Sequence, residues 1–174
     1  WDVIVWMDHR AVREAEECTT TGSRVLQYIG GTMSPEMEMP KLMWLKRHNK
    51  PAWDKMGAAY DLADFLSFRA TGSNARSCCT VTCKWTYLAH QDETWDHDFL
   101  SVIGMEDLND KINMHAPALA VGERIGTLDA QGAADLGLTT NCLVGAGLID
   151  AHAGALGTLG EYLDGDLDPV SYTH

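Results

Sequence analysis

Two aspartates stand where an apolar run gives way to a polar segment, and either could do chemistry there. Asp150 follows the run "NCLVGAGLI" and precedes "AHAGALG", and Asp8 follows "VIVWM". In open α/β sheets a ligand binds outside the carboxyl ends of the strands, so an acid at such an end can face it. A carboxylate there can act as a general base, bind a metal ion or accept hydrogen bonds from a polyol. For each aspartate, N-capping of the next helix is an equally good interpretation.

If the two apolar runs form neighbouring strands, both carboxylates converge on one cleft. Gly145, Gly147 and Gly154 surround Asp150 in the sequence and leave room for a ligand close to the backbone. Glycoside hydrolysis also uses paired carboxylates, so the residue types alone do not choose the reaction.

Other reactive side chains are weaker candidates. Lys84, between Cys83 and Trp85, is either a surface residue with a buried stem or a donor that reaches into the cleft. His152 has no third partner at the spacing of a zinc site, which favours a packing or supporting role. Among the five cysteines only Cys79 and Cys83 have ligand spacing, so we expect reduced, mostly buried thiols and no metal site. Reduced thiols favour a cytoplasmic location.

Composition excludes several classes of function. The chain has 174 residues, 45% of them hydrophobic and 22% charged, which suits one globular domain. A net charge of −12 argues against non-specific nucleic-acid binding and against binding to anionic membrane surfaces. No apolar stretch reaches the roughly 18 residues of a membrane span. Neither a G-x-x-x-x-G-K-[ST] loop nor a G-x-G-x-x-G turn after a strand is present, so the residues show no nucleotide site.

The elements that must position these residues alternate between strands and helices. Residues 3–7 and 141–150 predict buried strands, and 123–128 predict a third strand. The remaining patterns predict helices with expected caps at Asp8, Asp64 and Asp96, over residues 11–20, 23–29, 40–48, 51–56, 64–71, 97–103, 130–137 and 151–160. Residues 78–88 are ambiguous, and 161–174 read as a loop or tail. This alternation is typical of an α/β fold.

Six segments occur in the order and with the spacing of a known family. They are "VIVWMDHRA", "GGTMSPEMEMPKLMWLKRH", "YDLADFLSFRATG", "CKWTYL", "GTLDAQGAADLGL" and "GLIDAHAGALG". Together they resemble the N-terminal, sugar-binding domain of the FGGY carbohydrate kinases, close to the ribulokinase and D-ribulose kinase branch. The resemblance covers residues 1–160, so the chain is expected to be a piece of that domain.

The resemblance implies an actin-like (ribonuclease-H-like) fold of two domains around a cleft, here partial and without its first strands. It implies ATP-dependent phosphorylation of a pentulose, D-ribulose first, at a terminal hydroxyl. ATP and Mg²⁺ would be bound mainly by parts of the enzyme outside this chain, so the chain alone is expected to be inactive. In the full-length enzyme a homodimer is possible.

The same resemblance assigns roles to five residues. Asp150, which opens the "DAHAG" segment, takes the position of the catalytic base. Trp6 would pack on the carbons of the substrate, and Asp8 would lie beside its hydroxyls. Glu36 and Lys84 occupy positions of substrate-contacting side chains.

Two alternatives stay open from the sequence. Within the family, the substrate could be L-ribulose, ribitol, xylulose or glycerol, because polyol contacts differ by one or two side chains. From another class, the chain could be a non-catalytic sugar-binding domain in the same fold. A base at position 150 argues against the second alternative.

Overall fold

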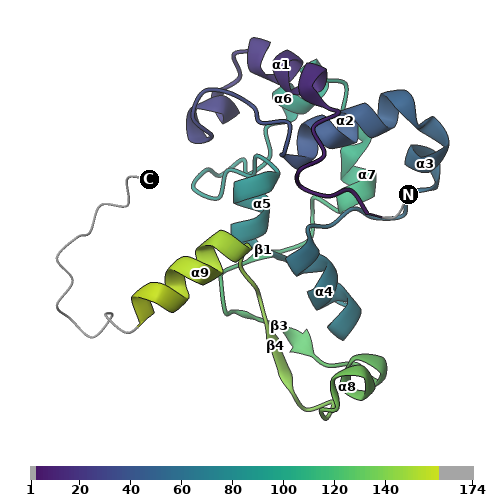
Figure 1. Cartoon of the computed structure of the whole chain (residues 1–174), viewed down its shortest axis with the longest axis vertical. Coiled ribbons are helices and arrows are strands. Elements are labelled where there is room, and N and C mark those ends of the chain that lie inside the picture. The colour runs from purple at the N-terminus through teal and green to yellow at the C-terminus, as the bar shows by residue number, and fades with distance from the viewer. Residues whose placement is uncertain (1–2, 161–174) are drawn as a thin grey trace.

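The computed structural model describes residues 3–160, and the predicted tail at 161–174 lies outside the described residues (Figure 1). The elements in chain order are α1 (Val12–Thr20), η1 (Arg24–Tyr28), α2 (Glu38–His48), α3 (Lys50–Lys55), α4 (Leu62–Thr71), β1 (Arg76–Ser77), α5 (Cys78–Lys84), α6 (His97–Val102), η2 (Glu106–Leu108), α7 (Asn109–Ile112), β2 (Ala118–Leu119), β3 (Arg124–Thr127), α8 (Ala130–Leu136), β4 (Leu143–Gly145) and α9 (Asp150–Leu159).

The main core lies among helices of the first two thirds of the chain. Its fully buried side chains include Met39, Met43, Trp85, Met105 and Leu108. Methionine is unbranched and flexible, so it fills the irregular gaps where short helices meet at differing angles. In Figure 1, α1, α2, α3, α6 and α7 form the upper body, with α5 directly beneath it.

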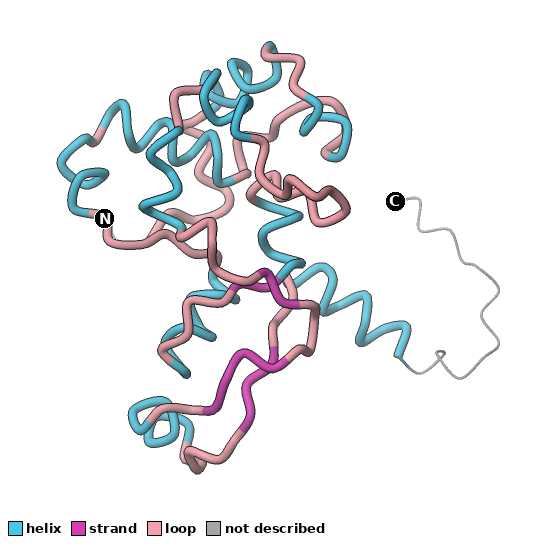
Figure 2. The backbone as a smooth tube through the Cα atoms, turned by 180° about the vertical axis from the view of Figure 1, so that it is seen from behind, coloured by secondary structure: helices cyan, strands magenta, loops and turns pink. Residues whose placement is uncertain are grey.

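Two small sheets connect this body to the rest of the chain. Strands β1 and β2 pair in parallel, and β3 and β4 pair antiparallel with an irregularity between Arg124 and Gly126. The antiparallel pair β3–β4 and the helix α8 that connects its two strands form an arm that packs on α4, as the tube in Figure 2 shows from behind. Helix α9 leaves the body beside α5 and β1 and has no buried residue (Figure 1).

Several predicted elements are confirmed. Helices form at 40–48, 97–103, 130–137 and 151–160 to within two residues, and β3 lies within the predicted strand 123–128. Asp96 caps α6 as expected, because its carboxylate accepts from the Phe99 N–H at 2.8 Å. In the described part of the chain, no helix combines the length and the apolar character that crossing a bilayer requires.

The predicted buried strand at 3–7 is wrong. Val3 is 81% exposed and Trp6 is 62% exposed, and the segment is a loop with a turn. A strand requires a neighbour that satisfies its backbone groups. Among residues 3–160 no strand pairs with this segment. The predicted buried strand at 141–150 is also reduced, to the short and largely exposed β4.

Two predicted caps are wrong for local reasons. Asp8 is not the cap of α1, because the N-cap of that helix is Ala11. The Asp8 carboxylate accepts hydrogen bonds from the backbone N–H and the guanidinium of Arg10 instead. Asp64 lies inside α4, where it is buried and accepts from the Ser77 N–H. The ambiguous segment 78–88 begins as helix α5 because the Ser77 hydroxyl caps it.

Candidate functional site

Asp150 is the first residue of α9, and its side chain is exposed. The N-cap position belongs to Ile149, and the helix has no side-chain cap bond. One carboxylate oxygen of Asp150 accepts from the adjacent Ala151 N–H at 2.8 Å. N-capping therefore does not explain this aspartate, and its carboxylate is open to a ligand.

The junction of β1 and α5 anchors the turn that presents Asp150. The Ser77 hydroxyl donates to the Gly147 carbonyl at 2.7 Å and accepts from the Cys79 N–H at 3.1 Å. The buried Asp64 carboxylate accepts from the Ser77 N–H at 2.8 Å. Burial raises the pKa of Asp64, while its bonds to Thr80 and Ser77 favour the ionised form. A chain of hydrogen bonds thus runs from α4 through Ser77 to the loop before α9.

The other predicted site residues gather around Lys41, which sequence reasoning missed. The Lys41 ammonium donates to the carbonyls of Val5 and Trp6, both at 2.9 Å, and so holds the exposed Trp6 loop against α2. Lys41 also interacts electrostatically with Asp8 and Glu36. No pattern in the sequence could reveal this role, because it depends on a loop that folds back over α2.

Asp8 and Glu36 are each engaged by a neighbour. The Arg10 guanidinium hydrogen-bonds to Asp8, at 2.7 Å from one oxygen and 2.8 Å from the other, and holds the pKa of Asp8 below its usual value. Glu36 lies 3.0 Å from Nε2 of His9. His9 and Arg10 therefore orient the two acids that are expected, from the family resemblance, to contact the substrate.

Lys84 lies at the end of α5, within electrostatic reach of two half-buried acids, Glu38 and Asp61. Burial and the Asp61 carboxylate raise the pKa of Glu38 to about 9, so Glu38 is protonated at neutral pH and hydrogen-bonds to Asp61. Burial likewise raises the pKa of Asp61, which accepts from the Trp85 indole N–H. Lys84 interacts favourably with both acids. This pair was not predicted, since Glu38 and Asp61 are far apart in the sequence.

Asp150 makes no direct polar contact with the four described residues that are expected to bind the sugar. Within residues 3–160, no hydrogen bond or ion pair joins Asp150 to Trp6, Asp8, Glu36 or Lys84. The connection runs through α5, which carries Lys84 at its C-terminal end and is capped at its N-terminal end by Ser77, the anchor of the α9 turn.

Two cysteine thiols and a histidine ring lie together at the start of α9, where His152 follows Asp150 by two residues. Nδ1 of His152 is 3.1 Å from Sγ of Cys79 and 3.9 Å from Sγ of Cys83. All five cysteines are free, as expected, but only Cys18 is buried. The prediction of mostly buried thiols is therefore wrong: Cys79 and Cys83 face His152 of α9, and Cys78 and Cys142 are also only partly buried.

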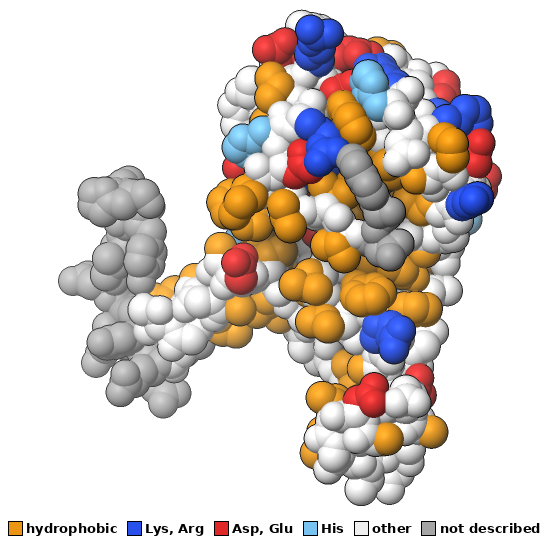
Figure 3. Space-filling view, turned by 45° about the vertical axis from the view of Figure 1, so that its right-hand side comes forward, with side chains coloured by type: hydrophobic (Ala, Val, Ile, Leu, Met, Phe, Trp, Pro, Cys, Tyr) orange, Lys and Arg blue, Asp and Glu red, His pale blue; other side chains and the backbone are white. Residues whose placement is uncertain are grey.

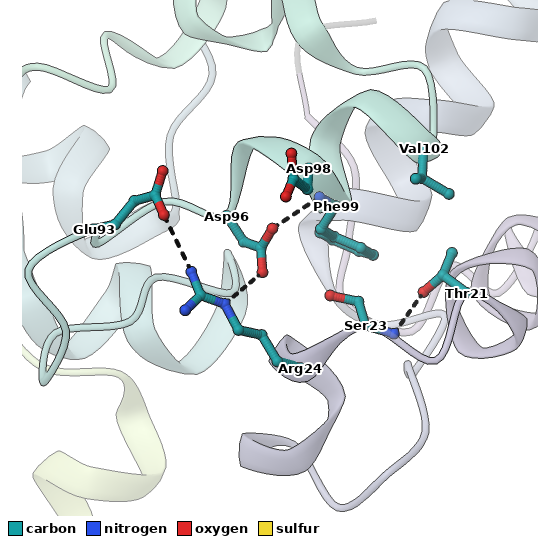
Figure 4. Close-up of a pocket in the computed structure, with 8 residues that line it drawn as sticks. All are labelled: Thr21, Ser23, Arg24, Glu93, Asp96, Asp98, Phe99 and Val102. Atoms are coloured by element: carbon teal, nitrogen blue, oxygen red, sulfur yellow. Dashed lines mark hydrogen bonds and ion pairs between the residues drawn. The ribbon is translucent and has the colours of Figure 1, made fainter.

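An open hollow elsewhere on the described part of the chain contains none of the predicted residues (Figure 4). It has a volume of about 510 Å³ and lies between η1 and α6. Its Arg24 pairs with Asp96 at 2.8 Å and with Glu93 at 3.5 Å, so the cation is already neutralised. This hollow is a polar groove between η1 and α6, and the predicted site residues lie elsewhere.

Comparisons with known proteins now give the family. The model for the N-terminal domain of the FGGY family of carbohydrate kinases matches residues 1–157. An FGGY carbohydrate kinase domain-containing protein of Danio rerio is 48% identical over 94% of this chain and 30% of its own length. The D-ribulokinase of Saccharomyces cerevisiae is 41% identical over 91% of this chain and 24% of its own. The chain thus spans about a third or less of the curated relatives that it matches.

Solved structures show the same fold. A xylulose kinase from Rhodospirillum rubrum superposes with a TM-score of 0.72 at 20% identity, covering 86% of this chain and 30% of the kinase. A gluconate kinase from Lactobacillus acidophilus gives a TM-score of 0.64 at 19% identity, covering 83% of this chain and 29% of the kinase. The expected partial actin-like α/β fold is confirmed. The chain belongs to the FGGY family of carbohydrate kinases and corresponds to part of the N-terminal domain.

Proposed function

We propose that the full-length protein carrying this chain is a pentulose kinase that transfers the γ-phosphoryl group of ATP to a terminal hydroxyl, with D-ribulose as the preferred acceptor. The observation that carries the proposal is Asp150, the first residue of α9, whose side chain is exposed and does not act as the N-cap of that helix. The 41% identity to a D-ribulokinase supports the choice of sugar. We also propose a cytoplasmic location, which suits five free thiols.

Asp150 is the proposed general base. A sugar hydroxyl is a weak nucleophile, and phosphoryl transfer needs positioning, charge neutralisation and an acceptor for the hydroxyl proton. As the sugar oxygen bonds to the γ-phosphorus, its proton passes to the Asp150 carboxylate, and the bond from phosphorus to the ADP oxygen breaks. A positioned carboxylate contributes about 10²–10⁴-fold to such a step.

Four residues are proposed to hold the sugar. The exposed indole of Trp6 offers an apolar face to the carbons of the substrate. The ionised carboxylate of Asp8 and the carboxylate of Glu36 accept hydrogen bonds from hydroxyls. Lys84 donates to an oxygen of the sugar, and it lies within electrostatic reach of Glu38 and Asp61.

ATP and Mg²⁺ are proposed to bind outside this chain. Mg²⁺, when bound, would neutralise phosphate charge. The chain has no glycine-rich phosphate loop, and its net charge of −12 does not favour a triphosphate. We therefore assign no contact to the nucleotide or the metal ion among residues 3–160.

A substrate panel with the full-length protein tests the proposal. ADP release is measured with D-ribulose, L-ribulose, xylulose, ribitol and glycerol. We expect the highest kcat/KM for D-ribulose. A higher kcat/KM for one of the other compounds would show that D-ribulose is not the preferred substrate and would assign the kinase to that compound instead. Binding of a pentulose in calorimetry without any ADP release in the presence of ATP and Mg²⁺ would instead indicate a non-catalytic sugar-binding domain.

A further inference from the structure

Three metal-ligating side chains from two helices meet beside Asp150. Cys79 and Cys83 lie four residues apart on α5, so both project from one face of that helix. His152 lies in the first turn of α9. The Sγ atoms of the two cysteines and a ring nitrogen of His152 all lie within 4.8 Å of one another.

These distances suit a tetrahedral cation. Zinc bonds of about 2.3 Å to sulfur and about 2.0–2.1 Å to nitrogen place neighbouring ligand atoms roughly 3.5–3.8 Å apart. The Sγ atoms of Cys79 and Cys83 lie 3.1 Å and 3.9 Å from Nδ1 of His152, so only small side-chain rotations are required. Thiolate and imidazole select zinc-like ions over Mg²⁺ and Ca²⁺, which prefer oxygen.

The surroundings allow an ion to enter. Both cysteines are partly exposed, and His152 is exposed. The helices are tied together next to the group, because Ser77 at the start of α5 binds the Gly147 carbonyl just before α9. The two halves of the site are therefore already close before any ion binds.

We propose that Cys79, Cys83 and His152 form a binding site for a thiophilic divalent cation of the Zn²⁺ class, with one coordination position left open. On binding, each thiol loses its proton to solvent and forms a bond to the cation, and Nδ1 of neutral His152 supplies the third bond. The two thiolates balance the double positive charge. The proposal is independent of the kinase activity.

Cobalt spectroscopy of the full 174-residue chain tests the site. The reduced, metal-free chain is titrated with Co²⁺, which reports thiolate ligands by a charge-transfer band and tetrahedral geometry by intense visible bands. We expect saturation at one ion per chain and displacement by Zn²⁺. Cys79→Ser, Cys83→Ser and His152→Ala should each weaken binding by about 100-fold or more. Cys78→Ser, on the same helix but outside the group, is the matched control and should bind normally.

A second measurement keeps the proposal falsifiable if a variant fails to fold. In the wild-type chain, Zn²⁺ should protect Cys79 and Cys83 from alkylation but leave Cys78 reactive, as read by mass spectrometry of peptides. Absence of the thiolate band, a band that survives Cys79→Ser, or equal alkylation of all three cysteines with and without Zn²⁺ would each overturn the proposal.

Discussion

At the scale of single residues, Lys41 explains how an exposed loop is held. Its ammonium joins the carbonyls of Val5 and Trp6 to α2, and it faces Asp8 and Glu36. The sequence predicted four substrate contacts but not this lysine. Residue types and spacing indicate which side chains can do chemistry, whereas the groups that position them follow from long-range packing.

Lys41→Met should destabilise the chain. The ammonium makes two charge-assisted hydrogen bonds, so its loss should lower the free energy of unfolding by about 1–3 kcal/mol. Urea denaturation measures the change. Lys50→Met is the control, because Lys50 pairs with the exposed Asp54 on α3, its one ion-pair partner among residues 3–160, and the substitution should change the value by less than about 0.5 kcal/mol. Equal effects of the two substitutions would contradict the anchoring role of Lys41.

Glu38 predicts a pH dependence of stability. Its pKa is raised from 4.5 to about 9 in the folded chain, so the folded state holds a proton that the unfolded state releases. Stability is then greatest below pH 4.5 for this group and falls as the pH rises toward about 9. Asp8, Glu17, Asp96 and Asp107 have lowered pKa values and act in the opposite direction, but only in the acid range.

Glu38→Gln removes the titration of this carboxyl group, because the amide stays neutral at every pH, whereas Asp61, whose pKa burial also raises, still titrates in both proteins. The urea midpoint of the wild-type chain should fall between about pH 6 and pH 9, a window that lies within the raised range of Glu38. The variant should show a flatter profile. Parallel profiles for the two proteins would show that Glu38 does not carry the proton in the folded state.

At the scale of elements, local signals predicted helices well and strands poorly. Asp96 is a helix cap in the sequence and in the structure, because a cap depends on residues three positions away. The apolar run at 3–7 fails as a strand because pairing depends on a partner, and none lies beside it among residues 3–160. The same limit applies to the expected convergence of Asp8 and Asp150 at neighbouring strand ends, which assumed that strand, whereas the proposed sugar contact of Asp8 rests on the family resemblance.

The α6 cap can be tested directly. Asp96→Ala removes the acceptor of the Phe99 N–H and the partner of Arg24, and should cost about 1–2 kcal/mol. Asp98→Ala, which changes an exposed acid two residues further along in the first turn of α6, is the control. Thermal unfolding should separate the two variants by several degrees; an equal melting temperature would show that the cap contributes nothing.

The close packing of α8 against α4 can also be tested by substitution. A Cβ at Gly132 of α8 would lie 2.7 Å from the Ala70 carbonyl oxygen of α4, so Gly132→Ala must push two helices apart. We expect a loss of about 1–3 kcal/mol in urea denaturation. Gly157→Ala in α9 meets nothing within 4 Å and should be neutral or stabilising. A neutral Gly132→Ala would mean that α8 is not packed on α4 as described.

At the scale of the whole molecule, apolar surface gathers where α9 leaves the body, as Figure 3 shows. Among the described residues, large exposed apolar side chains include Val5 and Trp6 in the N-terminal loop and Leu62, Phe65 and Leu66 on α4. Large exposed apolar areas typically mark interaction surfaces. The curated relatives are about three or more times as long as the matched region, which agrees with the expectation that this chain holds only part of a kinase.

The isolated chain should therefore not phosphorylate D-ribulose. It has neither a phosphate loop nor any assigned contact to ATP, so positioning of the nucleotide is absent. An ADP-release assay of the 174-residue chain with ATP, Mg²⁺ and the sugar should stay at the background rate. Turnover that increases with the concentration of the chain would contradict the proposal that ATP binds to parts of the enzyme outside this chain.

Replacement of Asp150 by asparagine in the full-length protein is the most direct test of the central claim. With the sugar and ATP saturating, Asp150→Asn should lower kcat by about 10²–10⁴-fold, while the Kd for D-ribulose in calorimetry changes by less than about tenfold. Asp135→Asn, an exposed acid on α8, should keep normal kcat. If Asp150→Asn retained wild-type turnover, the sugar hydroxyl would not pass its proton to this carboxylate, and the proposed base would be wrong.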